Sequence, residues 1–185
     1  MQDYREFLAE TIVSETALQQ RITELAAEIN RDYQGRDLVL FCILRGGIVF
    51  LTDLMRKITV PHTLDFMFVS SYMVGARQSS GQARITLDLK TDIFNRNVLL
   101  IEDIVDSGYT IQAVLDVLGV RKPNSLNVCV LLDKEERREV EVPIRYRGFV
   151  IPDKYVFGYG LDVDEYYRNL PFVGALDTQK YHPEG

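Results

Sequence analysis

Apolar positions along the chain follow two alternating spacings, that of amphipathic helices and that of buried strands. Near the N-terminus, apolar side chains recur every three to four residues, which predicts a helix with one buried face. These positions are Leu18, Ile22, Leu25, Ile29 and Tyr33. Thr16 and Gln19 match a capping box at the start of this helix, and Gly35 ends the pattern. The continuous apolar run at 38–43 that follows is typical of a central parallel strand.

The same alternation continues along the chain and predicts an α/β domain with a mostly parallel central sheet flanked by helices. Further strands are predicted at 64–70, 98–102 and 125–132, and further helices at about 48–57 and 109–118. The polar, glycine-containing segment 71–82 predicts a long mobile loop, and residues 145–176 predict short strands and turns rich in tyrosine. We find no repeat, low-complexity tract or domain boundary in the sequence.

Composition narrows the class of protein. The chain has 185 residues, enough for one domain with a real core, and 46% of them are hydrophobic, as in soluble proteins. No run approaches the roughly 20 apolar residues of a membrane span, and the first residues lack the pattern of a signal peptide, so we expect a cytoplasmic protein without a membrane partner. A net charge of −6 argues against a broad nucleic-acid-binding face.

The cysteines and histidines offer little catalytic chemistry. Cys42 and Cys129 both lie inside apolar runs, which indicates buried free thiols rather than a disulfide or a nucleophile. His62 and His182 are isolated, so a histidine metal site and a histidine-assisted nucleophile find little support.

The stretch VLLIEDIVDSGYT at 98–110 carries the strongest chemical signal, because three acids, Glu102, Asp103 and Asp106, follow a buried strand. Ligands of open α/β sheets bind beyond the carboxyl ends of strands. Backbone N–H groups of the Ser107–Thr110 turn would hold a phosphate at the helix start, and the two acids before it suit ribose hydroxyls or Mg²⁺. The alternative, in which Asp106 caps the helix and two acids are solvated, leaves the acids at the strand end unexplained.

This stretch closely resembles the phosphoribosyl-pyrophosphate motif of type I phosphoribosyltransferases. Other segments narrow the resemblance to the bacterial hypoxanthine-guanine phosphoribosyltransferases and follow the order of that family over about residues 12–176. They are the LRGG segment at 44–47, 65–72, the VLLDK segment at 130–134, and 148–162.

The resemblance implies a type I phosphoribosyltransferase fold in one domain spanning 1–185, with its core at about 35–140. A small hood subdomain would come from about 1–15 and 145–180, and a mobile loop at about 71–83, with Ser71 and Tyr72, would close over the site. The implied reaction transfers the 5-phosphoribosyl group of phosphoribosyl pyrophosphate to N9 of hypoxanthine and guanine, with Mg²⁺ as cofactor. It gives IMP and GMP plus pyrophosphate. The resemblance further implies a homodimer or homotetramer.

The resemblance also assigns roles to residues that hold the phosphoribosyl donor. Asp106 would be the catalytic proton acceptor, and a cis peptide bond would join Leu44 to Arg45. Glu102, Asp103 and Asp162 would serve the metal. The donor-binding residues would be Arg45, Gly46, Glu102, Asp103, Asp106, Ser107, Gly108, Tyr109, Thr110 and Arg168. A plain strand-to-helix turn would also explain Gly46 and Gly47, though not the cation before them.

Lys134 is the candidate for reading the base, because it ends a predicted strand at the same sheet edge. Its ammonium group only donates hydrogen bonds, so it would accept a 6-oxo group and reject the 6-amino group of adenine. The resemblance implies that Tyr155 stacks on the purine, that the backbone of Val156 meets its 2-position and that Asp162 lies nearby. A solvated lysine and packing tyrosines are the structural alternatives.

Three other functions compete with this interpretation. A related transferase could use xanthine, since the preference at the purine 2-position is not legible. An RNA-binding regulator on the same fold would need a basic face, and the Arg137-Arg138 pair is too short and too acid-flanked for one. A nucleotide-binding dehydrogenase is weaker still, because no G-x-G-x-x-G follows a strand.

Overall fold

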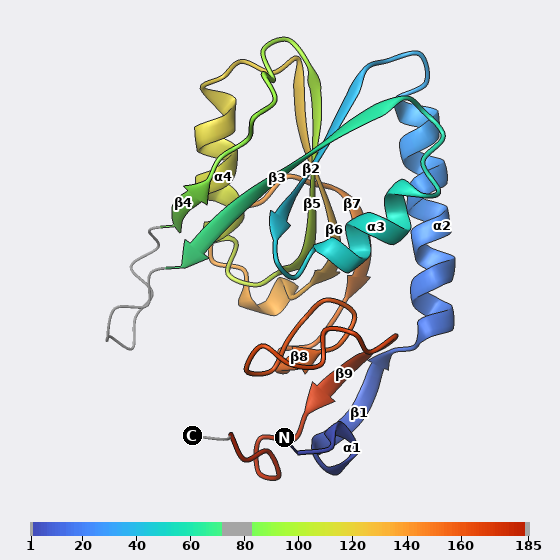
Figure 1. The fold of residues 1–185 in the computed structure, drawn as a ribbon, viewed down its shortest axis with the longest axis vertical. Coiled ribbons are helices and arrows are strands. Elements are labelled where there is room, and N and C mark those ends of the chain that lie inside the picture. The colour runs from blue at the N-terminus through green and yellow to red at the C-terminus, as the bar shows by residue number, and fades with distance from the viewer. Residues whose placement is uncertain (1, 72–82, 184–185) are drawn as a thin grey trace.

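A six-stranded sheet forms the centre of the protein (Figure 1). The structure, a computed structural model, describes residues 2–71 and 83–183, so Tyr72 and most of the predicted mobile loop lie outside the described residues. The strand order is β4-β3-β2-β5-β6-β7, and every neighbouring pair is parallel except β3 with β4. This confirms the predicted α/β fold. The strands are β2 (Leu38–Leu44), β3 (His62–Ser71), β4 (Ala83–Leu87), β5 (Asn97–Val105), β6 (Ser125–Asp133) and β7 (Ile144–Val150).

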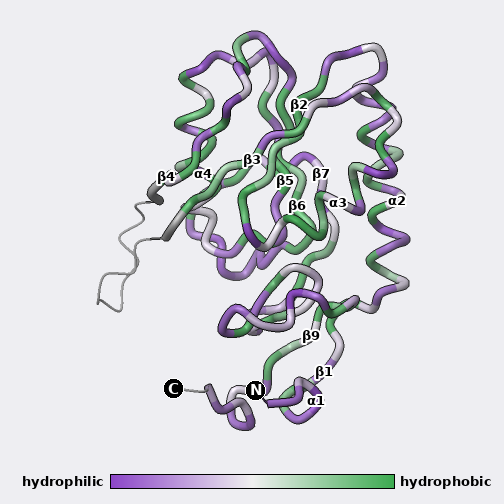
Figure 2. Tube along the Cα trace, viewed as in Figure 1, coloured by the Kyte–Doolittle hydropathy of each residue, from purple (hydrophilic) through white to green (hydrophobic). Residues whose placement is uncertain are grey.

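Helices cover both faces of this sheet. The helices α2 (Glu15–Asp32) and α3 (Ile48–Met55) pack on one face, and α4 (Tyr109–Gly119) packs on the other (Figure 1). Alternate residues of β2 divide between the two layers: Leu40 and Cys42 pack with α2 and α3, whereas Phe41 and Ile43 pack with α4. The central strands are accordingly hydrophobic along their length (Figure 2), as expected of a parallel sheet buried on both faces.

The start of α2 corrects one sequence prediction. The helix is capped by Ser14, whose Oγ accepts a hydrogen bond from the N–H of Ala17 at 3.3 Å. Thr16 and Gln19, the predicted capping box, therefore lie inside the helix. Gln19 instead donates to the carboxylate of Asp53 on α3 at 2.8 Å, which joins the two helices.

A smaller antiparallel sheet brings the two ends of the chain together below the central sheet (Figure 1). It consists of β1 (Leu8–Val13), β9 (Val173–Leu176) and β8 (Val156–Phe157), next to the short helix α1 (Tyr4–Phe7). Phe7 and Phe157 pack against each other in its core, with ring centroids 5.5 Å apart. We call these elements, with the loops at 151–172, the hood. Residues 144–150, which the sequence analysis placed largely in the hood, instead form β7 of the central sheet.

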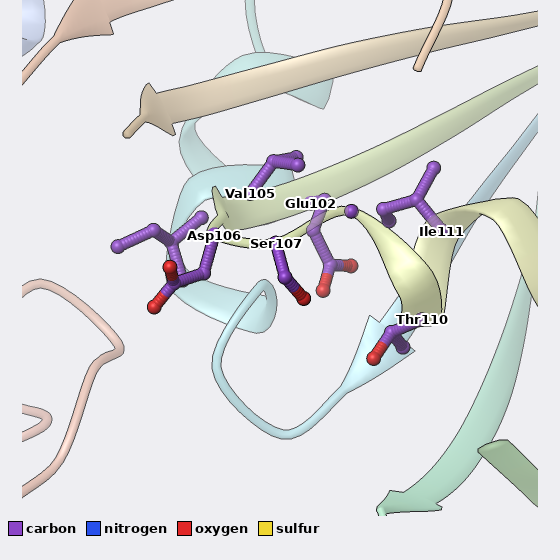
Figure 3. A pocket seen from close by; sticks show the side chains of 8 residues that line it. Glu102, Val105, Asp106, Ser107, Thr110 and Ile111 are labelled. Atoms are coloured by element: carbon purple, nitrogen blue, oxygen red, sulfur yellow. The ribbon is translucent and has the colours of Figure 1, made fainter. Parts of the chain in front are cut away.

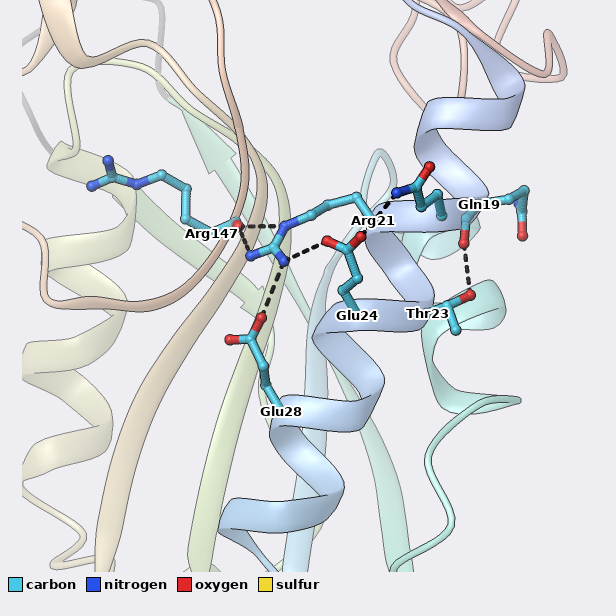
Figure 4. Close-up of polar contacts among 7 residues, drawn as sticks. Gln19, Arg21, Thr23, Glu24, Glu28 and Arg147 are labelled. Carbon is cyan, nitrogen blue, oxygen red and sulfur yellow. Dashed lines mark hydrogen bonds and ion pairs between the residues drawn. The ribbon is translucent and has the colours of Figure 1, made fainter.

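Polar contacts from α2 hold the edge strand β7 in place (Figure 4). Arg21 donates through Nη2 to the carbonyl of Arg147 at 2.7 Å and pairs with Glu24 and Glu28 at 3.0 and 3.1 Å. The side chain of Arg147 points away from Arg21 in the same view. Helix α2 thus holds the backbone of β7 through a hydrogen bond and leaves the Arg147 guanidinium free for other partners.

Two general predictions concern the interior and the membrane. Cys42 and Cys129 are buried free thiols, as expected from their sequence context. None of the helices in the described part of the chain is long and apolar enough to cross a membrane.

Gly148 provides a test of the close packing between β7 and β6. A Cβ added there would lie 3.0 Å from Cα of Leu131 and closer still to its carbonyl oxygen, so Gly148→Ala should force the strands apart. We expect the free energy of unfolding to fall by roughly 1–3 kcal/mol, measured by urea denaturation. Gly119, the last residue of α4, has no atom within 4 Å of its added Cβ, so Gly119→Ala is the matched control and should not destabilise. Equal stability of the two variants would contradict this packing.

Candidate active site

The loop after β2 brings a cation to the carboxyl edge of the sheet. The peptide bond between Leu44 and Arg45 is cis, as the resemblance implied. Gly46 lies directly against the carboxylate of Asp103 on one side and against Gly160 of the hood on the other, and a Cβ at either glycine would overlap the facing group. The loop is therefore packed between the end of β5 and the hood.

Glu102 and Asp103 lie within the strand β5 rather than in the loop after it. The sequence predicts a strand only to residue 102, but β5 runs to Val105, so Glu102 and Asp103 are strand residues with exposures of 9% and 8%. Because side chains alternate along a strand, the two carboxylates face opposite sides of the sheet. Glu102 faces the pocket before α4, and Asp103 faces Gly46.

Burial raises the pKa of both acids. Burial, and then the neighbouring Asp103 charge, raise the pKa of Glu102 well above its usual value, and Glu102 Oε2 has no hydrogen-bond partner. Burial raises the pKa of Asp103 to about 6, although the N–H of Ile104 donates to its carboxylate at 2.9 Å. A group that supplies donors or positive charge would stabilise both carboxylates.

A pocket of about 120 Å³ lies between the end of β5 and the start of α4. Gly108 caps the helix with φ of +95°, in the left-handed region that glycine tolerates, and so turns the chain sharply into α4. Figure 3 shows the oxygens of Glu102, Ser107 and Thr110 on the same side of this turn. The N-terminal N–H groups of α4 and the hydroxyls of Ser107 and Thr110 are hydrogen-bond donors at this pocket, and helix N-termini of this kind favour anions. The lining residues are Glu102, Ile104, Val105, Asp106, Ser107, Gly108, Thr110 and Ile111.

Asp106 and Lys134 meet across the ends of β5 and β6. Lys134, only 7% exposed, places Nζ 3.6 Å from Oδ2 of Asp106 and 3.6 Å from Oδ1 of Asp153. Arg137 approaches the same two carboxylates, with Nε 2.8 Å from Oδ1 of Asp106 and Nη1 3.5 Å from Oδ1 of Asp153. The four side chains form a compact group of two cations and two anions.

The hood contributes a second charged group next to the Gly46 loop. Arg168 pairs through Nη2 with Asp162 at 2.7 Å and with Glu165 at 3.1 Å, and it donates through Nη1 to the carbonyl of Gly160 at 2.9 Å. The other oxygen of Glu165 pairs with Arg45 at 2.9 Å. The carboxylate of Glu165 thus bridges Arg45 and Arg168, the two arginines that the resemblance assigns to the phosphoribosyl donor.

The remaining base-site candidates lie next to these groups in the hood. Tyr155 is 51% exposed, which leaves its ring available to a ligand, and its hydroxyl donates weakly to the carbonyl of Asp162 at 3.5 Å. Val156 is buried in β8, where its main chain pairs with Ala175 of β9. Tyr109, at the start of α4, donates its hydroxyl to Glu139 at 3.2 Å and is not among the residues that line the pocket before the helix. Ser71 ends β3 at the border of the described residues.

The structure adds Arg137, Asp153 and Glu165, which the sequence analysis did not place in the site. Arg137 follows Lys134 by three residues, and one helical turn returns it to the same side; this spacing was a usable signal. Asp153 precedes Tyr155 by two residues in the same turn. Glu165 lies in the same acidic segment as Asp162. Its pairing with Arg45 joins residues 120 positions apart, so no local sequence pattern predicts it.

Comparison with known proteins identifies the family. A family model described as the phosphoribosyl transferase domain matches residues 9–165. The chain belongs to the phosphoribosyl transferase family. It is 46% identical over 169 residues to a hypoxanthine phosphoribosyltransferase of Salmonella typhimurium, covering 90% of this chain and 94% of that one. It is 48% identical over 177 residues to a hypoxanthine-guanine phosphoribosyltransferase of Dictyostelium discoideum, covering 93% and 97%.

A solved structure agrees with this membership. The crystal structure of a hypoxanthine phosphoribosyltransferase from Staphylococcus aureus superposes with a TM-score of 0.92 at 42% sequence identity, covering 97% of each chain. The likeness spans the central sheet and the hood, so the implied type I phosphoribosyltransferase fold is confirmed.

The family uses a divalent cation, and the acids at the end of β5 fit one. Glu102 Oε2 is buried without a partner, and Asp103 is buried nearby, close enough to Asp162 that the Asp162 charge contributes to its raised pKa. Carboxylate oxygens are the ligands that Mg²⁺ prefers. Within residues 2–71 and 83–183, no three acidic, histidine or cysteine side chains converge on one point. Mg²⁺ with substrate oxygens and water as its other ligands suits this arrangement.

The raised pKa of Asp103 predicts how stability of the metal-free protein changes with pH. The folded state holds the proton more tightly than the unfolded chain, so the stabilising protonated form is complete below about pH 4 and is lost as pH rises towards about 6. Asp103→Asn should therefore raise the free energy of unfolding at pH 8 by roughly 1–3 kcal/mol and flatten its decline between pH 4 and 6. Urea denaturation at stepped pH measures both effects.

The control for this prediction is Asp88, whose pKa is lowered by its hydrogen bonds to Arg121. Its stabilisation is present above the unfolded pKa and is lost on acidification, so Asp88→Asn should destabilise at neutral pH, with the opposite sign. A lower stability of Asp103→Asn at pH 8 would mean that partners already compensate the Asp103 charge.

Proposed function

We propose that this protein is a hypoxanthine-guanine phosphoribosyltransferase. It transfers the 5-phosphoribosyl group of phosphoribosyl pyrophosphate to N9 of hypoxanthine or guanine, giving IMP or GMP and pyrophosphate. The observation that carries the proposal is the approach of Lys134 to Asp106 at 3.6 Å beside the phosphate-sized pocket. A base-reading donor, a proton acceptor and a phosphate site meet there, where a bond between base and ribose would form. The relatives named above support the substrate class.

The phosphoribosyl group binds between the C-terminal end of β5 and the N-terminus of α4. Backbone N–H groups and hydroxyls from Ser107 to Thr110 hold the 5-phosphate, and Glu102 and Asp103 accept hydrogen bonds from the ribose hydroxyls. Holding both ends of the sugar fixes C1, the atom at which bonds break and form. The unpartnered oxygen of Glu102 supports this role, because ribose hydroxyls would supply the donors it lacks.

The pyrophosphate leaves towards the Gly46 loop and the hood. Arg45 and Arg168 neutralise its charge, and Gly46, which has no side chain, lets it approach the end of β5. Glu102 on the side of the pocket, and Asp103 with Asp162 on the side of the Gly46 loop, would hold Mg²⁺ directly or through water, and the ion would supply further positive charge to the leaving group. Two guanidinium groups converging on one carboxylate, that of Glu165, support an oxyanion site here.

The purine lies between Lys134, Asp106 and the hood. Lys134 donates to the 6-oxo group and Asp106 accepts the proton from the five-membered ring, while Tyr155 stacks on the base and the main chain of Val156 faces its 2-position. Adenine would place amino donors against the Lys134 ammonium, so it is rejected. We further propose that the protein works in the cytoplasm as a homodimer or homotetramer, which light scattering on the purified protein tests.

The activity is tested by following absorbance with Mg²⁺, phosphoribosyl pyrophosphate and hypoxanthine, guanine, xanthine or adenine in turn. We expect turnover with hypoxanthine and guanine and none with adenine. Asp106→Asn cannot accept the purine proton and should lower kcat by about 10²–10⁴-fold. Asp116→Asn, which removes an exposed aspartate on α4, is the matched control and should keep full activity. Turnover confined to xanthine would overturn the base assignment, and no turnover with any base would overturn the function.

Glu165→Gln tests whether the carboxylate between Arg45 and Arg168 competes with pyrophosphate. The variant keeps the size of the side chain but removes the charge, so Arg45 loses its carboxylate partner and Arg168 keeps only Asp162 and the Gly160 carbonyl as partners. We expect the KM for phosphoribosyl pyrophosphate and the inhibition constant of pyrophosphate to fall about two- to fivefold, with the KM for hypoxanthine unchanged. Glu15→Gln, at an exposed position in the first turn of α2, is the control. A raised KM for the donor would show that Glu165 orders the arginines instead.

A further inference from the structure

The segment after β6 braces the loop that carries Asp106. The N–H of Lys134 donates to the carbonyl of Val105 at 3.0 Å, and the N–H groups of Glu139 and Val140 donate to the carbonyl of Ser107 at 3.0 and 3.2 Å. These bonds hold the residues on either side of Asp106. The peptide carbonyl of Asp106 itself is held by a side chain, that of Arg138.

Arg138 links the two strand ends through a single guanidinium group. Its Nε donates to the carbonyl of Asp106 at 3.2 Å, and its Nη2 pairs with Oδ1 of Asp133, the residue immediately before Lys134. Asp133 is 1% exposed and the Arg138 side chain 17%, so the link is largely removed from water. The planar guanidinium fork presents donors in fixed directions and can serve both acceptors at once, which an ammonium group cannot do in the same geometry.

The buried charge of Asp133 requires this pairing. Burial raises the pKa of Asp133, and the charges of Arg138 and Arg147 oppose that effect. A buried carboxylate without partners is costly, so the two arginines have a structural role at Asp133 whatever else they do. Only one of them also reaches Asp106: within the described residues, the Arg147 guanidinium pairs with Asp133 and Glu135.

We propose that Arg138 is a positioning residue for transfer of the 5-phosphoribosyl group and that it acts through Asp106. It fixes the Asp106 backbone relative to the Asp133–Lys134 strand end, so that the proton acceptor and the 6-oxo donor contact the same purine at the same time. The inference rests on the proposed function, in which Asp106 and Lys134 act on one base. A displacement of about 1 Å in such a site can lower the rate about 100-fold, which leaves room for a residue that touches no substrate.

Arg147 is a matched control for the structural role alone. Its Nε lies 3.0 Å from Oδ2 of Asp133 without making a hydrogen bond there, so Arg147→Gln removes a positive charge that faces the same buried carboxylate. Its backbone stays held by Arg21 (Figure 4), and its side chain makes no hydrogen bond to Asp106 in the described structure. Arg138→Gln and Arg147→Gln therefore differ in whether Asp106 loses its brace.

The experiment compares wild type, Arg138→Gln, Arg138→Lys, Arg147→Gln and the double variant Asp133→Asn/Arg138→Gln. Each is tested by urea denaturation and by steady-state kinetics with hypoxanthine and phosphoribosyl pyrophosphate in Mg²⁺. Both single Gln variants should lose stability. Arg138→Gln should lower kcat by about 10–100-fold with little change in the KM for the donor, Arg138→Lys should not restore it, and Arg147→Gln should keep kcat near the wild-type value.

The double variant separates positioning from folding, because it removes the buried charge together with its partner. It should regain stability over Arg138→Gln and still show the low kcat. Recovery of kcat in the double variant, or equal loss in Arg147→Gln, would overturn the positioning role and leave Arg138 as a partner of Asp133 only. Full activity of Arg138→Gln beside an active wild type would also overturn it. An inactive wild type would overturn the proposed function and this inference together.

Discussion

The parallel register of β2, β5 and β6 is the constraint on which the active site depends. Leu38 pairs with Asn97 and Asn97 with Ser125, so the three strands begin level and end at one edge. Val105 and Asp133 are register partners, and the residues that follow them, Asp106 and Lys134, are therefore neighbours. Since strand side chains alternate, a slip by one residue would move every side chain of β5 to the opposite face. The hydrophobic packing of both sheet faces thus fixes the chemistry at the edge.

Charge is distributed unevenly over this edge. Glu102 and Asp103 are buried and poorly compensated, whereas the outer charged groups already pair with one another: Asp106 with Arg137, and Arg45 with Glu165. An anionic ligand that reaches the arginines must displace an internal carboxylate, so part of its binding energy is offset. A ligand that supplies donors to Glu102 meets no such competitor. In the proposed function, this difference would favour firm binding of the sugar and weaker binding of the leaving group, and so the release of pyrophosphate.

The sequence predicts the fold well because each element has a local pattern. Apolar runs and helical spacing located the central strands and the three large helices, and the acids of β5 marked the edge that carries the site. Local patterns also caused the errors. The carboxylates of Glu102 and Asp103 looked like a strand end, although β5 continues to Val105, and Thr16 resembled a cap although Ser14 is the one used. The pairing of Arg45 with Glu165 depends on the hood folding back over the sheet, which no local pattern encodes.

The hood completes the site only because it is fixed to the core. Tyr159 donates to Asp53 of α3 at 2.5 Å, and Gly160 packs directly on the backbone of Gly46. Tyr159 adopts a left-handed conformation with φ of +51°, which the packing around it must stabilise. These contacts hold the hood, including β8, at a set distance from the Gly46 loop. A reaction that depends on positioning two substrates needs such a frame, because the fold then supplies the orientation that neither substrate has in solution.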